Sequence, residues 1–320
     1  NIRTKNIPGL KDISTGNWTL GPDLDPFLFL RWAKYIVENG SLMAVDTMRY
    51  VPLGLETSQE YLLHPYLIAW FHNVASLFGS ESVTHSAILY PVVMFALTIV
   101  AFFFLARIIF IDIVGVKRAN IIGLISAFFL TVMPSLLPRT IAGIPEKESV
   151  SFLLMFLAFY FFLAAWRNKN LKGSIVLALL AGIFTAAMAS VWGGFIFIFI
   201  TLAGTTFLAF ILEKIKMKEF YIYLTWILVS IGILGIFSPE RYSLSAIFSN
   251  MYLLVAIFVL IILITHIFLV KKYQKINSWK IFKNLPNHLI SIVIAGIISV
   301  GMSILLFGPS LLLNIFSNIL

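Results

Sequence analysis

The chain has 320 residues, of which 60% are apolar and 12% are charged, and its mean hydropathy is +0.98. Soluble domains contain about 45–50% apolar and about 25% charged residues, so this composition excludes a water-soluble globule and indicates a polytopic membrane protein. The net charge of +9 would suit a nucleic-acid-binding protein, but in membrane proteins such an excess usually lies in cytoplasmic loops. The absence of cysteine excludes disulfides, iron–sulfur clusters and a cysteine nucleophile.

Residues 1–82 are the least hydrophobic part of the chain and carry eight of its fourteen acidic residues. Within them, Asp25 and Pro26 precede an apolar stretch that contains Arg31 and Lys34. Proline favours the first turn of a helix and aspartate favours the N-cap, so a helix is predicted here, lying in the membrane interface. On residue type alone, Asp25 can be the cap of this helix or a functional carboxylate.

Eight membrane spans are predicted after this segment. A helix that crosses the hydrocarbon core needs about 20 apolar residues, and charge-poor runs of this size lie at 86–106, 119–137, 149–166, 220–238, 246–270 and 289–307. Another uncharged run, 173–212, would be about 60 Å long as one helix, which is twice the core thickness. It must therefore fold back, and the turn is predicted at 190–194, where Trp192 precedes two glycines.

The loops between these spans alternate in charge. The loops 138–148, 190–194 and 238–245 contain few basic residues, and the positive-inside rule places them, together with residues 1–82, on the outer side. Eleven of the fourteen carboxylates are then outside, so the basic excess is an orientation signal and nucleic-acid binding has no support. The fourteen predicted cytoplasmic basic residues are Arg107, Lys117, Arg118, Arg167, Lys169, Lys172, Lys214, Lys216, Lys218, Lys271, Lys272, Lys275, Lys280 and Lys283.

The predicted fold is therefore an all-α polytopic membrane protein. Residues 1–82 form an external loop with interfacial helices, and residues 83–320 form a transmembrane bundle of about eight spans. The chain begins with Asn1 and carries no signal peptide before this external loop, so we expect a membrane helix or signal upstream of it. The apolar C-terminal end without a polar tail indicates a fragment at that end too.

A second acidic group lies at the outer end of a predicted span, in the segment 139–149. Its proline followed by Glu146 and Glu148 is typical of a helix start, because carboxylates favour the positive end of the helix dipole. Its level in the membrane, near Asp23 and Asp25, favours a second interpretation, since oxygen ligands of this kind bind Mg²⁺ or Mn²⁺. Side chains at i and i+2 of a helix point about 200° apart, so one glutamate would bind the metal and the other would support it.

Other motifs are weaker. The five histidines, His64, His72, His85, His266 and His288, show no metal-ligand spacing and are expected to have packing or interfacial roles. No P-loop, dinucleotide fingerprint or nucleophile elbow occurs in the sequence. Asn17-Trp18-Thr19 and Asn39-Gly40-Ser41 match the N-glycosylation pattern on the predicted outer side.

Taken together, these segments resemble the catalytic subunit family of oligosaccharyltransferases, in its archaeal branch, over essentially the whole chain. The stretch from Asp25 to Arg31 resembles the family's first external-loop motif, D-P-[WYF]-F-N-Y-R. The stretch from Arg139 to Glu148 resembles R-S-V-A-G-x-x-D-x-E, and Trp192-Gly193-Gly194-Phe195 resembles the W-G-G-[YF] turn between the fifth and sixth spans. Residues 46–52 resemble the archaeal D-x-M-R-Y-x-P stretch, and the four motifs occur in the family's order.

The resemblance implies a C-type glycosyltransferase transmembrane bundle in which these spans are the second to the ninth of thirteen. It implies transfer of an oligosaccharide from a dolichyl phosphate or diphosphate to the Asn of Asn-x-Ser/Thr, with inversion, on the extracytoplasmic face of the cell membrane. The family's later glutamate and acceptor-binding motif do not occur in this sequence, so the chain alone is expected to be inactive.

The resemblance also implies roles for individual residues. Asp25, Glu146 and Glu148 would be catalytic and would bind Mg²⁺ or Mn²⁺, and Glu146 stands where the family usually has the shorter Asp. Asp23, Arg139 and Trp192 are candidates for substrate binding, with ion pairing favoured for Arg139. The implied partners are the lipid-linked oligosaccharide, a sequon-containing acceptor protein and the lipid bilayer.

Two alternatives remain at this stage. One is another polyprenyl-phosphate-dependent membrane glycosyltransferase, which would also carry an acidic first external loop but not the motif at 139–148. The other is a transporter, whose ionisable residues should lie near the middle of the membrane. Here the interiors of the spans are almost free of charge, which argues against transport.

Overall fold

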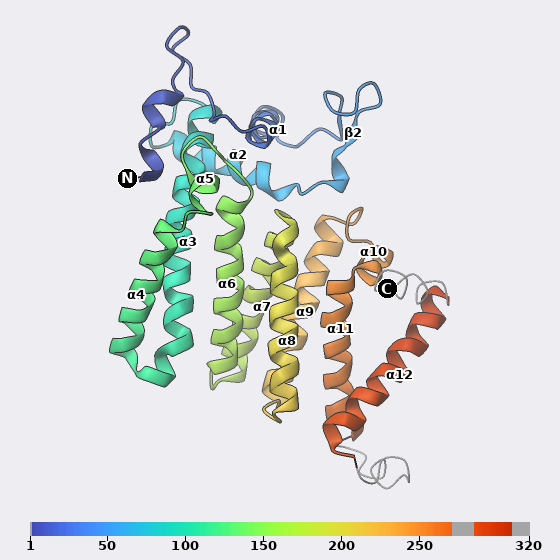
Figure 1. The fold of residues 1–320 in the computed structure, drawn as a ribbon. Helices are drawn as coiled ribbons and strands as arrows, with labels where there is room; N and C mark the ends of the chain where they lie inside the picture. Colours follow the sequence, from blue (N-terminus) through green and yellow to red (C-terminus); the bar gives the residue numbers. More distant parts are fainter. Residues whose placement is uncertain (1, 271–284, 309–320) are drawn as a thin grey trace. The chain divides into compact units, whose positions relative to one another are not determined.

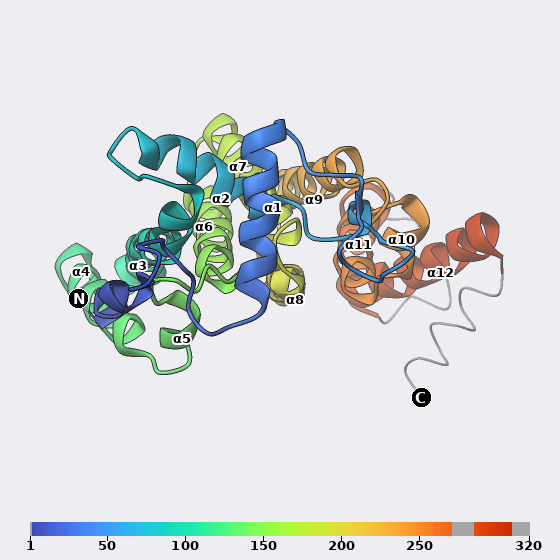
Figure 2. The ribbon, with the colours of Figure 1, turned by 90° about the horizontal axis from the view of Figure 1, so that it is seen from above.

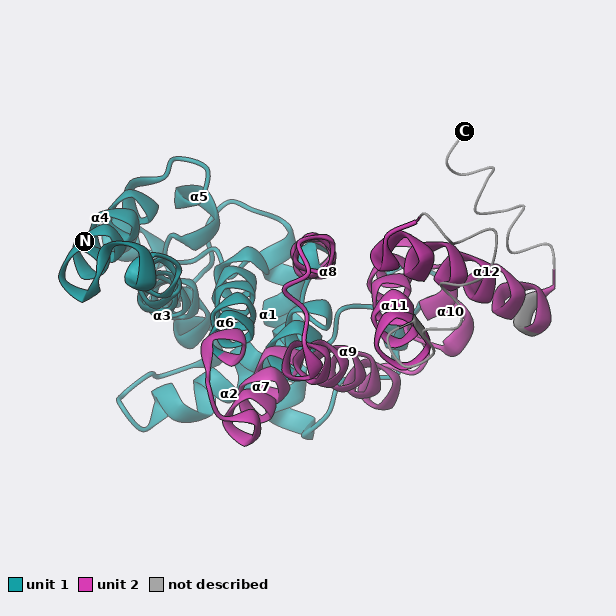
Figure 3. Cartoon of the chain, turned by 90° about the horizontal axis from the view of Figure 1, so that it is seen from below, with its two compact units in different colours: residues 1–164, 183–195 teal, residues 165–182, 196–320 magenta. Residues whose placement is uncertain are grey.

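The computed structural model describes residues 2–270 and 285–308. The chain divides into two compact units (Figure 3): unit 1 comprises 1–164 and 183–195, and unit 2 comprises 165–182 and 196–320. Residues 1–82, called the external segment here after their predicted location, and all predicted site residues belong to unit 1. The predicted basic loop from Lys271 to Lys283 lies outside the described residues.

Seven described helices are long and apolar enough to cross a membrane (Figure 1), which confirms a multi-pass membrane protein. The remaining predicted span, at 119–137, corresponds to α4 (Val116–Val132). Its 17 residues are at the lower limit for crossing the bilayer, so the count of eight spans stays a prediction. The seven are α3 (Val83–Val114), α6 (Glu148–Arg167), α7 (Leu171–Ala189), α8 (Ile196–Ile211) with the preceding η4 (Gly193–Phe195), α9 (Met217–Phe237), α11 (Met251–Ile264) with its π-helical extension η5 (Thr265–Val270), and α12 (Asn287–Phe307).

Three predicted span boundaries were wrong. The span predicted at 86–106 continues to Val114, so Arg107 lies within the helix. The span predicted at 119–137 ends at Val132, because Met133 is extended before Pro134, as residues preceding proline usually are. The span predicted at 246–270 is interrupted at Asn250, whose side-chain oxygen accepts the N–H groups of the first turn of α11. The residues before it form a separate short helix, α10 (Leu244–Ser249).

The predicted turn at 190–194 is confirmed. Helix α7 ends at Ala189, and a short 3-10 turn leads into α8. A Cβ atom at Gly194 would lie 2.0 Å from the Trp192 ring, and one at Gly193 would lie 2.9 Å from the hydroxyl of Tyr61. The two glycines thus allow the close backbone approach that the sequence predicted.

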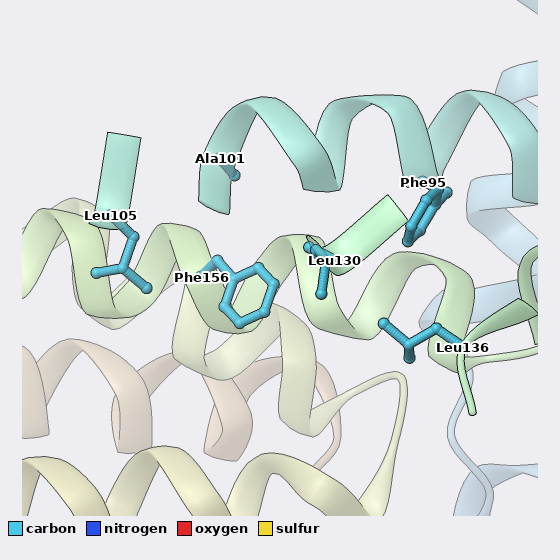
Figure 4. Close-up of a cluster of buried hydrophobic side chains, with 6 residues drawn as sticks. All are labelled: Phe95, Ala101, Leu105, Leu130, Leu136 and Phe156. Carbon is cyan, nitrogen blue, oxygen red and sulfur yellow. The ribbon is translucent and has the colours of Figure 1, made fainter. Parts of the chain in front are cut away.

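The core of unit 1 fixes the helices that bear the second acidic group. Helix α3 packs along α4, and α5 (Leu137–Thr140) also lies against α3. Buried side chains from α3, α4, α6 and the turn before α5 meet in one cluster (Figure 4), so α6 is packed against α3. The cluster consists of Phe95, Ala101, Leu105, Leu130, Leu136 and Phe156.

The external segment lies against one end of these helices. It contains η1 (Ile2–Thr4), η2 (Ile7–Leu10), α1 (Asp25–Asn39), the antiparallel strands β1 (Val45–Asp46) and β2 (Leu55–Glu56), η3 (Thr57–Gln59) and α2 (Leu63–Ser76). Helix α1 contacts α2 and α3. It is seen end-on in Figure 1 and along its length in Figure 2, so it lies across the direction of α3, α4 and α6. Its place in the membrane interface stays a prediction.

A buried ion pair joins α1 to the strand that follows it. The fully buried Asp46 accepts hydrogen bonds from the guanidinium of Arg31 and, at 2.9 Å, from the indole N–H of Trp32. Burial acts to raise the pKa of Asp46, but these donors and the backbone N–H of Met48 outweigh it and hold the pKa below its ordinary value. The carboxylate therefore stays charged and fixes the two motifs to each other.

The backbones of two glycines join the two acid-bearing segments. The N–H of Gly21 donates to the carbonyl of Gly143 at 2.9 Å, and the N–H of Gly143 donates to the carbonyl of Ile88 in α3 at 3.0 Å. Gly143 has a φ of +82°, and a Cβ atom there would lie 2.5 Å from Leu10 Cδ1. Only glycine fits both this conformation and this contact.

We expect Asp46→Asn to lower the free energy of unfolding by about 3 kcal/mol, because it leaves the charge of Arg31 without its partner. This value is the low end of the range for buried pairs, since the Arg31 side chain is 30% exposed. The control is Glu60→Gln, which breaks a pair with Arg49 in which both side chains are 31% exposed, and should cost at most about 1 kcal/mol. Unfolding of the two variants in detergent measures the difference, and equal losses would contradict it.

We expect Gly143→Ala to destabilise the protein more than Gly40→Ala. Both glycines have left-handed φ angles, +82° and +80°, but a Cβ atom at Gly40 meets nothing within 4 Å. Both variants therefore cost about 1–2 kcal/mol of backbone strain, and Gly143→Ala adds about 1–3 kcal/mol for the clash with Leu10. A thermal unfolding midpoint that falls equally in both variants would show that the close approach at Gly143 is unimportant.

Candidate functional site

Arg139 connects the two acidic segments. Its Nη1 atom lies 3.1 Å from Oε1 of Glu146 and 3.5 Å from Oδ2 of Asp23. Asp23 follows Gly21 closely in sequence, and Glu146 follows Gly143, so the glycine contact brings both carboxylates to the same arginine. The predicted ion pairing of Arg139 is thus confirmed, and the two distant segments meet in one place.

Glu146 is the most buried carboxylate of this group, with 4% of its surface exposed. It lies in an irregular segment before α6, where its own backbone carbonyl accepts the hydroxyl and the N–H of Ser149 at 2.7 and 3.1 Å. Because α6 begins only at Glu148, the predicted divergence of the two glutamates on a regular helix does not apply.

The charge around Glu146 is unbalanced. The pKa of Glu146 is raised to about 7, mainly by burial and then by the charge of Glu148, with smaller contributions from Asp23 and Asp25, and Arg139 opposes the rise. Three other carboxylates therefore act on Glu146, and one arginine opposes them. Such a group of anions favours the binding of a cation.

Asp25 is not a helix cap. It occupies the first turn of α1, and the N-cap position is Leu24, without a side-chain capping bond. The interpretation of Asp25 as the cap was therefore wrong. Its side chain is exposed, and within the described part of the chain no hydrogen bond or ion pair engages its carboxylate. Asp25 and Glu148 both lie at helix starts, where the positive end of the dipole stabilises an anion.

The carboxylate groups are too far apart in this structure to bind one metal ion together. Among residues 2–270 and 285–308, no group of three or more His, Asp or Glu side chains is close enough to hold a metal ion. Arg139 lies against Oε1 of Glu146 instead. The donor chemistry nevertheless fits a hard divalent cation, because every acidic side chain of the group offers oxygen ligands. The shared cation stays a prediction.

Lys147, between the two glutamates, ties this segment to α1. Its Nζ atom lies 5.0 Å from the centre of the Phe29 ring and 5.3 Å from that of Tyr61. Phe29 is one helical turn after Asp25 on α1, so a cation–π contact worth about 0.5–1 kcal/mol holds the helix of one carboxylate against the segment of the others. No sequence motif indicated this contact.

His64 supports the same segment through a hydrogen bond to its backbone. Its Nε2 atom lies 2.9 Å from the carbonyl oxygen of Pro145, next to Glu146. Burial lowers the pKa of His64 to about 4, so the ring is neutral near pH 7 and donates its Nε2–H to that carbonyl. Its edge-on contacts with Phe29 and Tyr90 confirm the predicted packing role. Its bond to Pro145 was not predicted, because 81 residues separate the partners.

Trp192 packs against Phe152, with ring centres 6.0 Å apart, and against Gly194. The neighbouring Gly193 approaches Tyr61, which also contacts Lys147. Trp192 is therefore linked to the acidic group through Phe152 on α6, the helix that begins at Glu148, and through its neighbour Gly193, which approaches Tyr61. Its role in substrate binding stays a prediction, as do the roles of Asp23 and Arg139.

Solved structures share this fold. The archaeal oligosaccharyltransferase AglB from Archaeoglobus fulgidus, in complex with an inhibitory peptide and a dolichol-phosphate, superposes with a TM-score of 0.70 at 19% identity, over 99% of this chain and 37% of that chain. The Archaeoglobus fulgidus oligosaccharyltransferase in complex with Zn and sulfate gives a TM-score of 0.69 at 20% identity, over 96% of this chain and 39% of that one.

Curated relatives are named as glycosyltransferases that act on proteins with lipid-linked oligosaccharides. The STT3 subunit of the dolichyl-diphosphooligosaccharide–protein glycosyltransferase of Saccharomyces cerevisiae is 26% identical over 212 residues, 64% of this chain and 28% of the relative. The dolichyl-phosphooligosaccharide-protein glycotransferase of Methanococcus voltae is 23% identical over 184 residues, 53% of this chain and 19% of the relative. The chain thus spans less than a third of the length of these relatives.

A family model decides the assignment. The model described as "Oligosaccharyl transferase STT3, N-terminal" matches residues 16–320, which is nearly the whole chain and includes both acidic segments and the Trp192 turn. The chain belongs to the STT3 oligosaccharyl transferase family.

Proposed function

We propose that the full-length protein transfers an oligosaccharide from a dolichyl phosphate or diphosphate to the asparagine of Asn-x-Ser/Thr in acceptor proteins. The observation that carries this proposal is that the segments of two family motifs meet: Arg139 of the second motif contacts Glu146 of the same motif and Asp23, which lies two residues before the first motif. The Archaeoglobus fulgidus structures with a dolichol-phosphate and with an acceptor peptide containing a sequon support the choice of donor and acceptor.

The chemistry explains why carboxylates are needed. The nitrogen of a carboxamide is a poor nucleophile, because its lone pair is conjugated with the carbonyl. A carboxylate that accepts a hydrogen bond from the amide positions it and assists the loss of its proton. Asp25 suits this role, since it is exposed at the end of α1 and has no ion-pair partner in the described part of the chain.

A divalent cation belongs to this proposal, and Mg²⁺ and Mn²⁺ fit the oxygen ligands better than softer metals. When bound, such a cation neutralises the developing charge on a phosphate leaving group. Asp25, Glu146 and Glu148 would hold it, and Asp23 would remain a partner for Arg139. The structure with Zn and sulfate supports a divalent metal in this fold.

The active site is proposed to face the extracytoplasmic side. The acidic group lies in the segments that the distribution of Lys and Arg places outside, together with the external segment 1–82. A lipid-linked donor in the bilayer and a protein acceptor in the aqueous phase both have access to such a position. A transporter is not favoured, because the carboxylates of this group lie at helix starts and in loops.

We expect Asp25→Ala and Glu146→Ala, each made in the full-length protein, to reduce glycosylation of a sequon peptide by more than about 100-fold, because each removes a charge that acts on the reacting groups. Glu38→Ala is the matched control, since Glu38 is an exposed carboxylate on the same helix as Asp25. The assay measures glycopeptide formed with a lipid-linked donor. Activity retained in either variant, with unfolding midpoints unchanged, would contradict the assignment.

A further inference from the structure

We propose that Asn17 of this chain is itself an acceptor for an N-linked glycan, an inference that rests on the proposed function. The sequence contains two matches to Asn-x-Ser/Thr, at Asn17 and Asn39. Both lie in the segment 1–82, which is predicted to be on the side of the active site. The side chain of Asn17 is exposed and that of Asn39 is hydrogen-bonded within its helix, so we choose Asn17.

Asn17 lies on a small hairpin that precedes α1. Lys11 and Trp18 form an antiparallel bridge, and the N–H of Asp12 donates to the carbonyl of Asn17 at 2.9 Å. The Asp12 carboxylate accepts the N–H and the hydroxyl of Ser14 at 2.7 and 2.6 Å, which closes the turn. The dark blue loop in Figure 1 projects beyond the helices of unit 1.

The side chains of the sequon alternate between the two faces of the hairpin. Trp18 stacks on His85 in α3 with ring centres 4.7 Å apart, so it faces the protein. Asn17 and Thr19, as neighbours of Trp18 on an extended segment, face the opposite side, and both are exposed. The amide and the hydroxyl that define a sequon are therefore presented together to the solvent. In the described part of the chain, no hydrogen bond engages either side chain.

Asn39 is held differently. It is the last residue of α1, and its Nδ2 atom donates to the carbonyl of Tyr35 at 3.0 Å. The next residue, Gly40, has a left-handed φ of +80° and closes the helix end. The reacting nitrogen of Asn39 is thus bonded within the helix, and its sequon is not extended.

The reaction at Asn17 is the same group transfer as for other acceptors. The co-reactant is a glycan linked to a lipid phosphate. The bond between its anomeric carbon and the phosphate oxygen breaks, and a bond forms from that carbon to Nδ2 of Asn17. The amide loses one proton, which is released to the solvent, and the lipid phosphate leaves with one more negative charge than it had in the donor.

Mass spectrometry of the full-length protein, purified from the cells that make it, tests this inference. Trypsin places the two sequons on separate peptides, 12–31 and 35–49. We expect peptide 12–31 to carry the glycan found on other sequon proteins of the same cells, and peptide 35–49 to be unmodified. Thr19→Ser should keep the glycan and Thr19→Ala should remove it, since only the former retains the hydroxyl.

The outcomes separate this inference from the proposed function. An unmodified peptide 12–31, in cells whose other sequon proteins carry the glycan, overturns the inference alone. A glycan on peptide 35–49 instead, or one that persists in Thr19→Ala, also overturns it. In cells that make only the Glu146→Ala protein, we expect all these glycans to be lost, and their persistence would overturn the proposed function.

Discussion

The hydrogen bond between Gly21 and Gly143 is the contact on which the site depends. It joins two segments that are far apart in sequence, and each carries acidic residues just beyond its glycine. The bond from Gly143 to Ile88 fixes this pair to α3, and the buried cluster fixes α6 to the same helix. The carboxylates are thus positioned by rigid helices and by backbone contacts that larger residues would prevent.

The electrostatic state of Glu146 follows from this geometry. A buried carboxylate surrounded by other carboxylates is costly, and Arg139 offsets only part of the charge. The proposed divalent cation would offset the rest. The neutral His64 holds the same segment through Pro145 without adding a competing charge.

Much of the fold could be predicted from the sequence, and so could the proximity of the two acidic segments. The spans can be predicted from composition, because the hydrocarbon core of a membrane requires long apolar helices. The two glycines after Trp192 indicate the turn between α7 and α8. The cap at Asn250 could not be predicted, because an asparagine in an apolar run gives no local sign of where its side chain bonds. The pairing of Arg31 with Asp46, and the contact of Lys147 with Phe29, depend on tertiary packing that no spacing in the sequence encodes.

Anomalous scattering from Mn²⁺ in crystals of the full-length protein tests the central claim most directly. The account predicts one strong peak within about 2.0–2.6 Å of carboxylate oxygens from both Asp25 and Glu146, so that a single ion joins the two segments. A peak bound to only one of these segments, or a Glu146 that stays paired with Arg139 while Mn²⁺ binds elsewhere, would contradict it.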